Sequence, residues 1–270
     1  MSVEALRIEN LQLTYKGLTG MTFSKPRALS FFERVKNNDT EMIHDTNLVL
    51  QRGETLCIGG PSGQGKSALL RIIAGLTRPN EGTFYYFGEH IPPERHTALE
   101  IAKRQVGLVF QNGALISNLT VRDNIALPLK YHKAGTPSEI EEKINMAMDL
   151  MRVRNEANRF PHELSVGMQK RVAIARSWAM DPKLLLMDEP TAGLDNYNRR
   201  NLLPLIDNMR NLFKTSIIIV THDLMIAKEL DCNLCFLYNH TLSEPHSFDY
   251  WLNANNDISK VLFRDLHKTK

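Results

Sequence analysis

Two kinds of apolar pattern alternate along this 270-residue chain. Short, continuous apolar runs at 184–187 and 216–220 are typical of strands buried on both faces of a parallel sheet. Similar runs at 55–58 and 105–110 predict two further strands. Residues 3–16 instead alternate between apolar and polar positions, as a half-buried strand does. The pattern therefore predicts an α/β fold.

A long helical pattern interrupts the strands between residues 119 and 179. Four apolar residues recur there at helical spacing, namely Ile140, Ile144, Met148 and Met151. We expect their helix to be capped by Ser138, and the methionines to pack in a core. Further strands are expected at 48–50 and, as an aromatic-rich edge strand, at 82–87. The organisation is an α/β core with a helical insert.

Two segments follow neither pattern. Residues 17–46 are broken by glycine, proline and asparagine around a short apolar and basic piece at 28–35. This segment is compatible with a surface insertion and with a contact surface for a partner. The tail from Ser247 onward has a basic end and scattered apolar positions, namely Phe248, Trp251, Leu252, Val261, Leu262 and Phe263. This pattern suits either packing on the core or binding of a small regulatory subunit.

Composition narrows the class of protein. Apolar residues make up 43% of the chain and charged residues 23%, as in ordinary globular proteins. The net charge of +3 is too small to argue for nucleic acid binding. No apolar run approaches the roughly 20 residues of a membrane span, and the N-terminus lacks a signal-peptide pattern. We therefore expect a cytosolic protein that meets a membrane only peripherally or through a partner.

The three cysteines predict no disulfide framework. Their odd number, and their positions on apolar stretches, suit a reducing compartment. Cys232 and Cys235 form a C-x-x-C pair, which zinc sites and redox sites also use. No second pair exists to complete a zinc site, and both lie in an apolar run at 230–238. Core packing is the favoured interpretation for both residues, as for Cys57.

Residues 60–67 carry the strongest chemical signal in the chain. They match G-x-x-x-x-G-K-[ST], the P-loop, between an apolar strand pattern and an apolar helix pattern at 68–74. Such a loop turns successive N–H groups toward phosphate oxygens, and the following helix directs its positive end at the same anion. Lys66 is placed to reach the β- and γ-phosphates, and Ser67 to ligate Mg²⁺. The predicted nucleotide-binding residues are Gly60, Pro61, Ser62, Gly63, Gln64, Gly65, Lys66, Ser67 and Ala68.

Polar side chains follow three more predicted strands. Asp188 and Glu189 end the strand at 184–187, where an aspartate can hold Mg²⁺ and a glutamate can polarise an attacking water. His222 follows the strand at 216–220 and suits a hydrogen bond to a γ-phosphate. Gln111 follows the strand at 105–110 and is a possible ligand of the metal or the water. Taken alone, His222 and Gln111 are weak indications.

One helix in the predicted insert has a clear start. Ser165 is expected to cap a helix that runs to about Met180. The N-terminus of a helix attracts anions, although a well-capped helix need not bind anything.

Taken together, these motifs resemble the nucleotide-binding subunit of an ATP-binding cassette (ABC) transporter over nearly the whole chain. Their order is that of the family: the P-loop, Gln111, LSVGMQ at 164–169, MDEP at 187–190, AGLD at 192–195 and His222. The resemblance implies an ATPase with a P-loop NTPase core, a mostly parallel sheet, an antiparallel β subdomain and an inserted α-helical subdomain. Within a single ABC domain spanning 1–270, it assigns the core and β subdomain to 1–104 and 180–245, the helical subdomain to 105–179, and a tail to 246–270.

The resemblance also implies a homodimer. Two head-to-tail copies would hold two ATP molecules with Mg²⁺, each between one P-loop and the other copy's Ser165 and Gly167. Asp195 would link the two sites. Tyr15 matches the aromatic residue that stacks on adenine, with Phe23 or Phe31 as substitutes because the 17–46 segment stretches the usual spacing.

Permease subunits are the second expected partner. In the family, their coupling helices dock near the glutamine loop, here around 111–118, which places the protein on the cytoplasmic face of the inner membrane. The signature departs from the usual LSGGQ, because Val166 replaces a glycine and Met168 replaces the glutamine. We expect activity to survive and Val166 to slow turnover by crowding the closed dimer.

A finer resemblance concerns the subfamily. The turn at 113–115 and Met168 resemble Mla-type ATPases, which serve bacterial lipid transporters that work with Mce-domain proteins. That resemblance implies transport of phospholipid, with permease and Mce-domain partners. An alternative is a lipoprotein-releasing or solute-importing ABC subunit, which shares the core motifs. A soluble ABC protein of translation or DNA maintenance is disfavoured because this chain has room for neither a second cassette nor a long coiled coil.

Overall fold

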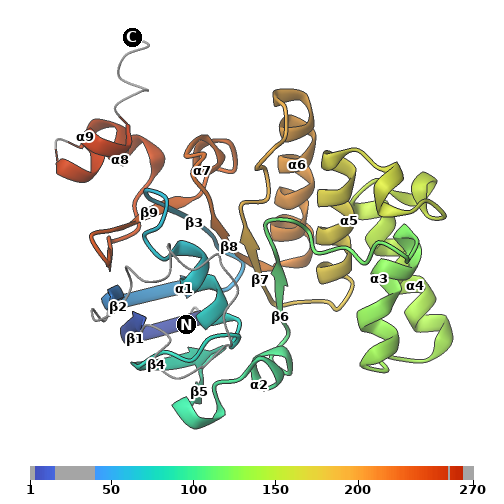
Figure 1. Ribbon diagram of the computed structural model, residues 1–270, viewed down its shortest axis with the longest axis horizontal. Helices are drawn as coiled ribbons and strands as arrows, with labels where there is room; N and C mark the ends of the chain where they lie inside the picture. The colour runs from blue at the N-terminus through green and yellow to red at the C-terminus, as the bar shows by residue number, and fades with distance from the viewer. Residues whose placement is uncertain (1–3, 16–39, 255, 264–270) are drawn as a thin grey trace, which may run out of the picture.

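The computed structural model describes residues 4–15, 40–254 and 256–263. Among these residues the main body is a six-stranded sheet, and Figure 1 shows helices on both of its sides. The strands run in the order β10-β9-β3-β8-β7-β6. Neighbouring strands from β9 to β6 are parallel, and β10 adds an antiparallel edge. Their bounds are β3 Thr55–Gly59, β6 Val106–Val109, β7 Leu184–Asp188, β8 Ser216–Val220, β9 Asn233–Tyr238 and β10 Thr241–Leu242. This confirms the predicted α/β fold with a mostly parallel sheet.

A second sheet, which is antiparallel, packs on the face of the main sheet that also carries α1 Lys66–Ile73, the helix after the P-loop. Its order is β2-β1-β4-β5, formed by β1 Glu4–Tyr15, β2 Thr40–Gln51, β4 Glu81–Tyr86 and β5 Glu89–Ile91. The strand expected at 82–87 is therefore not an edge strand, since β1 and β5 flank it. The strand expected at 48–50 begins at Thr40, so residues 40–46 of the segment expected to be irregular belong to a strand. Residues 16–39, which include the piece at 28–35, lie outside the described residues.

The helical insert is built from three helices, α3 Val121–Tyr131, α4 Pro137–Leu150 and α5 Val166–Trp178. The cap of α4 is Thr136 rather than Ser138. Thr136 accepts a hydrogen bond from the Glu139 amide, and the Glu139 carboxylate accepts one from the Thr136 amide. This capping box satisfies two amides that would otherwise lack partners. Ser165 caps α5 by accepting from the Met168 amide, as expected.

The boundary expected at residue 105 lies too early. Val106–Val109 pairs with β7 as a strand of the main sheet, so the helical subdomain begins after Val109. The other helices are α1 Lys66–Ile73, α2 Ala98–Ala102, α6 Asn196–Phe213, α7 Met225–Glu229, α8 Phe248–Asn253 and α9 Asp257–Leu262.

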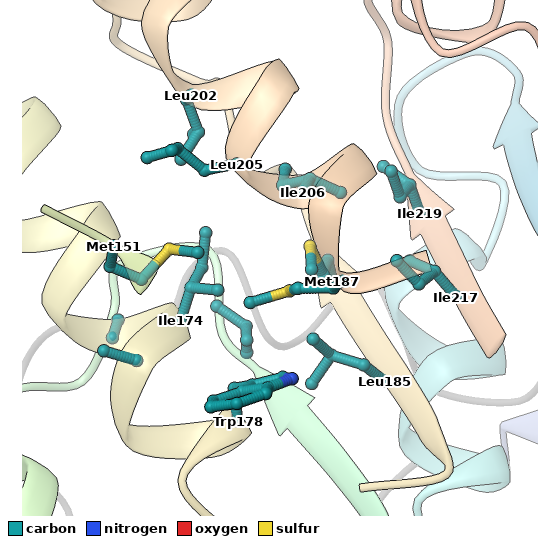
Figure 2. Close-up of a cluster of buried hydrophobic side chains, with 14 of the residues drawn as sticks. Met151, Ile174, Trp178, Leu185, Met187, Leu202, Leu205, Ile206, Ile217 and Ile219 are labelled. Atoms are coloured by element: carbon teal, nitrogen blue, oxygen red, sulfur yellow. The ribbon is translucent and has the colours of Figure 1, made fainter. Parts of the chain in front are cut away.

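The main sheet separates two hydrophobic cores because successive strand residues point to opposite faces. Leu184, Leu186 and Ile218 belong to the core shared with α1 and the antiparallel sheet. Leu185, Met187 and Ile217 instead belong to the core shared with α5 and α6. Figure 2 shows this second core, with side chains of β7 and β8 meeting those of the two helices. The P-loop helix and the signature helix therefore pack on different sides of one sheet.

The C-terminal tail packs on the core, which was one of its two predicted interpretations. Phe248, Trp251 and Phe263 are buried in the α5 side core, and the indole of Trp251 donates to the Leu234 carbonyl at 2.6 Å. The cysteines are free, with Cys57 and Cys235 buried on neighbouring strands. The apolar run at 230–238 becomes a strand only from Asn233, so Cys232 precedes it. In the ranges that the structure describes, no helix is both long and apolar enough to span a membrane.

Candidate nucleotide site

The predicted chemistry gathers at the carboxyl edge of the parallel sheet. Ile58 of β3 and Asp188 of β7 are both in register with Val220 of β8. The residues that follow these three strands therefore emerge side by side. Gly60 and the P-loop follow β3, Glu189 follows β7, and Thr221 and His222 follow β8. Open α/β sheets bind ligands at this edge.

Backbone geometry explains the glycines of the P-loop. Gly60, Gly63 and Gly65 have φ values of 137°, 83° and 94°, which side-chain-bearing residues rarely adopt. A Cβ at Gly60 would lie 2.3 Å from the Leu237 carbonyl oxygen, so space as well as backbone conformation excludes a side chain. Gly65 stands directly before α1 and turns the chain into it. The loop thus leads its amides to the positive end of a helix.

Lys66 folds back over the loop that it follows. Its ammonium donates to the carbonyl oxygens of Gly60 at 2.7 Å and Pro61 at 2.8 Å, and the side chain is buried. Burial lowers the pKa of Lys66, while Glu189 and Asp188 nearby act to raise it. The ammonium therefore lies on the inner side of the loop, next to the carboxylates of β7 and its following residue.

Ser67 in the first turn of α1 meets Asp188 at the end of β7. The Ser67 hydroxyl donates to Asp188 Oδ1 at 3.0 Å. Burial raises the pKa of Asp188, an effect that the bond from Ser67 opposes. The two oxygens fit a Mg²⁺ site, because that ion takes few protein ligands and completes its shell with water and phosphate oxygens.

Glu189 is held in a strained and well-anchored conformation. Its φ of 47° is left-handed, and its amide donates to the Val220 carbonyl at 2.8 Å. The carboxylate accepts from the Thr221 hydroxyl at 3.2 Å and lies 2.9 Å from His222 Nδ1. The Glu189 side chain is only 12% exposed, whereas His222 is 66% exposed. The pair thus joins a shielded carboxylate to an imidazole that reaches solvent.

Three further predicted residues lie on α5 and α6. Ser165 is exposed at the start of α5, and Gly167 is buried where an added Cβ would meet Asn198 Oδ1 at 3.0 Å. Asp195 caps α6 by accepting from the Asn198 amide at 2.7 Å, and the bonds from Asn198 lower the pKa of Asp195. Among the described residues, no hydrogen bond or ion pair joins the start of α5 to the P-loop. The P-loop helix α1 and α5 also pack in different cores, on opposite faces of the main sheet.

Gln111 lies on the loop after β6 and is exposed. It borders a cavity of about 360 Å³ between that loop, the start of α5 and the turn at Ala192 and Gly193. Val166, at 53% exposed, lines the same cavity. The adenine-stacking assignments rest on the Tyr15 side chain, Phe23 and Phe31, which lie outside the described residues.

The sequence pattern missed two contributors to this site. Lys170 donates to the main-chain carbonyls of Gln111 and Glu189. Thr221 holds the Glu189 carboxylate. The T-H-D triplet after β8 was a usable signal for Thr221, whereas a lysine inside a helix is usually a surface residue.

Comparisons with known proteins agree on one family. Residues 43–192 match the family model described as ABC transporter. The chain is 40% identical over 195 residues to a sulfate/thiosulfate import ATP-binding protein, CysA, of Mesostigma viride, covering 72% of this chain and 54% of that protein. It is 34% identical over 227 residues to the methionine import ATP-binding protein MetN 1 of Burkholderia ambifaria, covering 84% and 66%. The chain thus spans between half and two thirds of the length of these relatives.

A solved structure gives the same result. The fold is similar to a post-hydrolysis dimer of the ATP-binding cassette MJ0796 bound to ADP and Pi, with a TM-score of 0.72 and 27% identity over 90% of this chain and 98% of that one. The fold is similar to that cassette, and residues 43–192 match the family model. The chain belongs to the ABC transporter family.

Proposed function

We propose that this protein is the ATPase subunit of a membrane ABC transporter. The observation that carries the proposal is the convergence of two contacts at one sheet edge, Ser67 with Asp188 and Glu189 with His222. The first pair provides oxygen ligands for a metal, and the second provides a base with an oriented partner. Phosphoryl transfer needs both, together with a phosphate cradle.

Binding of ATP would exchange partners at the P-loop. Lys66 would leave the carbonyls of Gly60 and Pro61 for the β- and γ-phosphates, whose charge attracts it more strongly. Ser67 and Asp188 would hold Mg²⁺, which neutralises charge on the phosphates. Gln111 would complete the shell of the metal or position the attacking water.

Glu189 would accept a proton from the attacking water. The contacts from Thr221 and His222 fix its Oε2, which leaves the other carboxylate oxygen available to the water. His222 would then bond the γ-phosphate from its exposed position.

The active form would be a head-to-tail homodimer. Ser165 and Gly167 start α5, away from the P-loop of their own chain, so a second copy is needed to bring such residues to the γ-phosphate. The similar cassette MJ0796 was solved as a dimer. Asp195 would join the two sites from the start of α6.

The resemblance implies permease docking around 111–118, but we instead place the docking surface on an apolar groove of about 500 Å³ beside α3, whose lining does not include that loop. Leu127, Pro128 and Tyr131 line it from α3, and Leu108 and Met180 line its base. Tyr131 is 80% exposed although its ring meets that of His132 edge-on, with 5.0 Å between the ring centroids, so most of this large ring is open to a docking partner. Docking there would hold the protein peripherally on the cytoplasmic face of the inner membrane.

Import of a small solute is the cargo class that the comparisons favour, since the relatives named above are a sulfate/thiosulfate and a methionine importer. Phospholipid transport with Mce-domain partners remains a second candidate. It rests on Met168 and on the Gly113–Ala114 turn, whose carbonyls are both bound by Arg176.

Co-purification with the native membrane partners tests the proposal. We expect a permease to accompany the protein and to change its ATPase rate. A solute-binding protein in the complex would support import, and an Mce-domain protein with bound phospholipid would support lipid transport. A Leu127→Asp variant should lose the permease while keeping ATP binding, with the exposed Met146→Asp on α4 as control. Retention of the permease by the Leu127→Asp variant would contradict the assigned docking groove.

A further inference from the structure

Lys170 is a buried cation in the middle of α5. Its side chain is 5% exposed, although lysine is almost never buried without a partner. The ammonium donates to the carbonyl oxygen of Gln111 and, at 3.0 Å, to that of Glu189. No ion pair joins it to a carboxylate within the described part of the chain. Lys170 is therefore bound to the main chain of two residues that the proposed reaction uses.

The buried charge of Lys170 is compensated by its surroundings. Burial lowers the pKa of Lys170, and the charges of Glu189 and Asp188 oppose that effect. A buried ammonium is costly unless hydrogen bonds and nearby negative charge compensate it. Simple packing would be served equally well by an apolar side chain, so the charge needs another explanation.

Lys170 anchors Glu189 where its backbone is strained. The residue has a left-handed φ of 47°, a conformation that side-chain-bearing residues avoid. Val220 accepts from its amide at 2.8 Å, and Lys170 donates to its carbonyl at 3.0 Å. The backbone is thus fixed on both sides of the Cα from which the carboxylate projects.

A second cation on α5 holds the same loop as Lys170. Arg176 donates to the carbonyls of Gly113 and Ala114, both at 2.8 Å. Together the two side chains bind the loop from Gln111 to Ala114 to one helix. A movement of α5 would therefore be transmitted to Gln111 and, through Lys170, to Glu189.

We propose that Lys170 is a positioning residue for ATP hydrolysis that links the two nucleotide sites of the dimer. It would hold Gln111 and Glu189 in the site of its own chain. The N-terminus of the same helix, with Ser165 and Gly167, would contact ATP on the partner. When this helix contacts the ATP on the partner, it would thereby align the main chain of Gln111 and Glu189 in the site of its own chain. This inference rests on the proposed ATPase function.

The test compares ATPase kinetics of Lys170→Met with those of the wild-type protein. The methionine keeps the length and apolar stem of the side chain but removes its charge and its donors. We expect kcat to fall about 10- to 100-fold, as for a misplaced catalytic group, while KM for ATP changes less than about twofold. Lys143→Met is the matched control, because Lys143 on α4 also donates to a main-chain carbonyl, that of Ala134, away from the site. Its kcat should stay at the wild-type value.

Rescue separates positioning from folding. Lys170→Arg keeps a charge and donors, so it should recover most of the lost kcat. If Lys170→Met does not fold, Lys170→Gln replaces it with the same expected loss, because its shorter amide cannot span both carbonyls. A folded Lys170→Met or Lys170→Gln variant with wild-type kcat, or a loss seen only in KM, overturns this inference alone. A wild-type protein that does not hydrolyse ATP overturns the proposed function, and this inference with it.

Discussion

The buried histidine beneath the P-loop helix makes stability depend on pH. His96 is fully buried between Phe84, whose ring centroid lies 4.3 Å away, and Tyr86, whose hydroxyl lies 3.2 Å from Nε2. The Tyr86 hydroxyl donates to the Ile73 carbonyl at the end of α1. His96 thus belongs to the contact that joins the antiparallel sheet to the P-loop helix. We predict that His96→Phe removes a pH-dependent part of the folding free energy.

Burial sets the size of this effect. It lowers the pKa of His96 from 6.5 to about 4. Between these values the unfolded chain binds a proton that the folded chain does not, so stability rises with pH across this window. The contribution is complete above pH 6.5 and is lost as pH falls toward 4. At about 1.4 kcal/mol for each tenfold change in proton affinity, the loss amounts to roughly 3 kcal/mol.

Urea unfolding between pH 4 and pH 7 measures this difference. The free energy of unfolding of the wild-type protein should fall by roughly 3 kcal/mol more than that of His96→Phe on going from pH 7 to pH 4. His90→Phe removes an exposed histidine from the same sheet and should keep the wild-type dependence. Parallel curves for the wild-type protein and His96→Phe would show that burial of His96 does not make the stability depend on pH.

Three other predictions concern the nucleotide site. Gly60→Ala would place its Cβ 2.3 Å from the Leu237 carbonyl oxygen, so it should abolish ATP binding and lose more stability than Gly63→Ala. The Cβ of Gly63→Ala has open space, so this variant should lose only about 1 kcal/mol of stability. Equal losses of stability in denaturant melts of the two variants would contradict this. Val166→Gly should raise the ATPase rate up to about tenfold by removing a side chain that we expect to crowd the closed dimer, and an unchanged rate would count against such crowding. Removal of Mg²⁺ with EDTA, or Asp188→Asn, should stop hydrolysis while fluorescent ATP still binds, and hydrolysis without metal would exclude the assigned ligands.

The residues at the carboxyl edge of the main sheet could be predicted from the sequence, because each of them follows a recognisable strand. Prediction from the sequence failed at two places where the local residue pattern does not match the structure that forms. Residues 40–47 were not identified as a strand because β2 pairs with β1 through several register shifts, which break the alternation of apolar positions. The cap of α4 was assigned to Ser138, although Thr136, with Pro137 at the first helical position and Glu139 three residues on, has the fuller cap pattern.

The role of Lys170 was beyond sequence reasoning for a different reason. Both of its acceptors are main-chain carbonyls on loops distant in sequence. No side-chain pattern encodes such a contact. The fold alone shows that this helical lysine points into the site rather than toward solvent.

ATP hydrolysis by Glu189→Gln tests most directly whether Glu189 is the general base of an ATP-bound dimer. The substitution keeps the size of the side chain and removes the base, so hydrolysis should fall at least about 100-fold while ATP binding persists. Size-exclusion chromatography with ATP should then show a stable dimer that the wild-type protein does not accumulate. Glu142→Gln, on the exposed face of α4, should behave as the wild-type protein does. Normal hydrolysis by Glu189→Gln would contradict the assignment of Glu189 as the base. A Glu189→Gln variant that stays monomeric in the presence of ATP would contradict the proposed dimer.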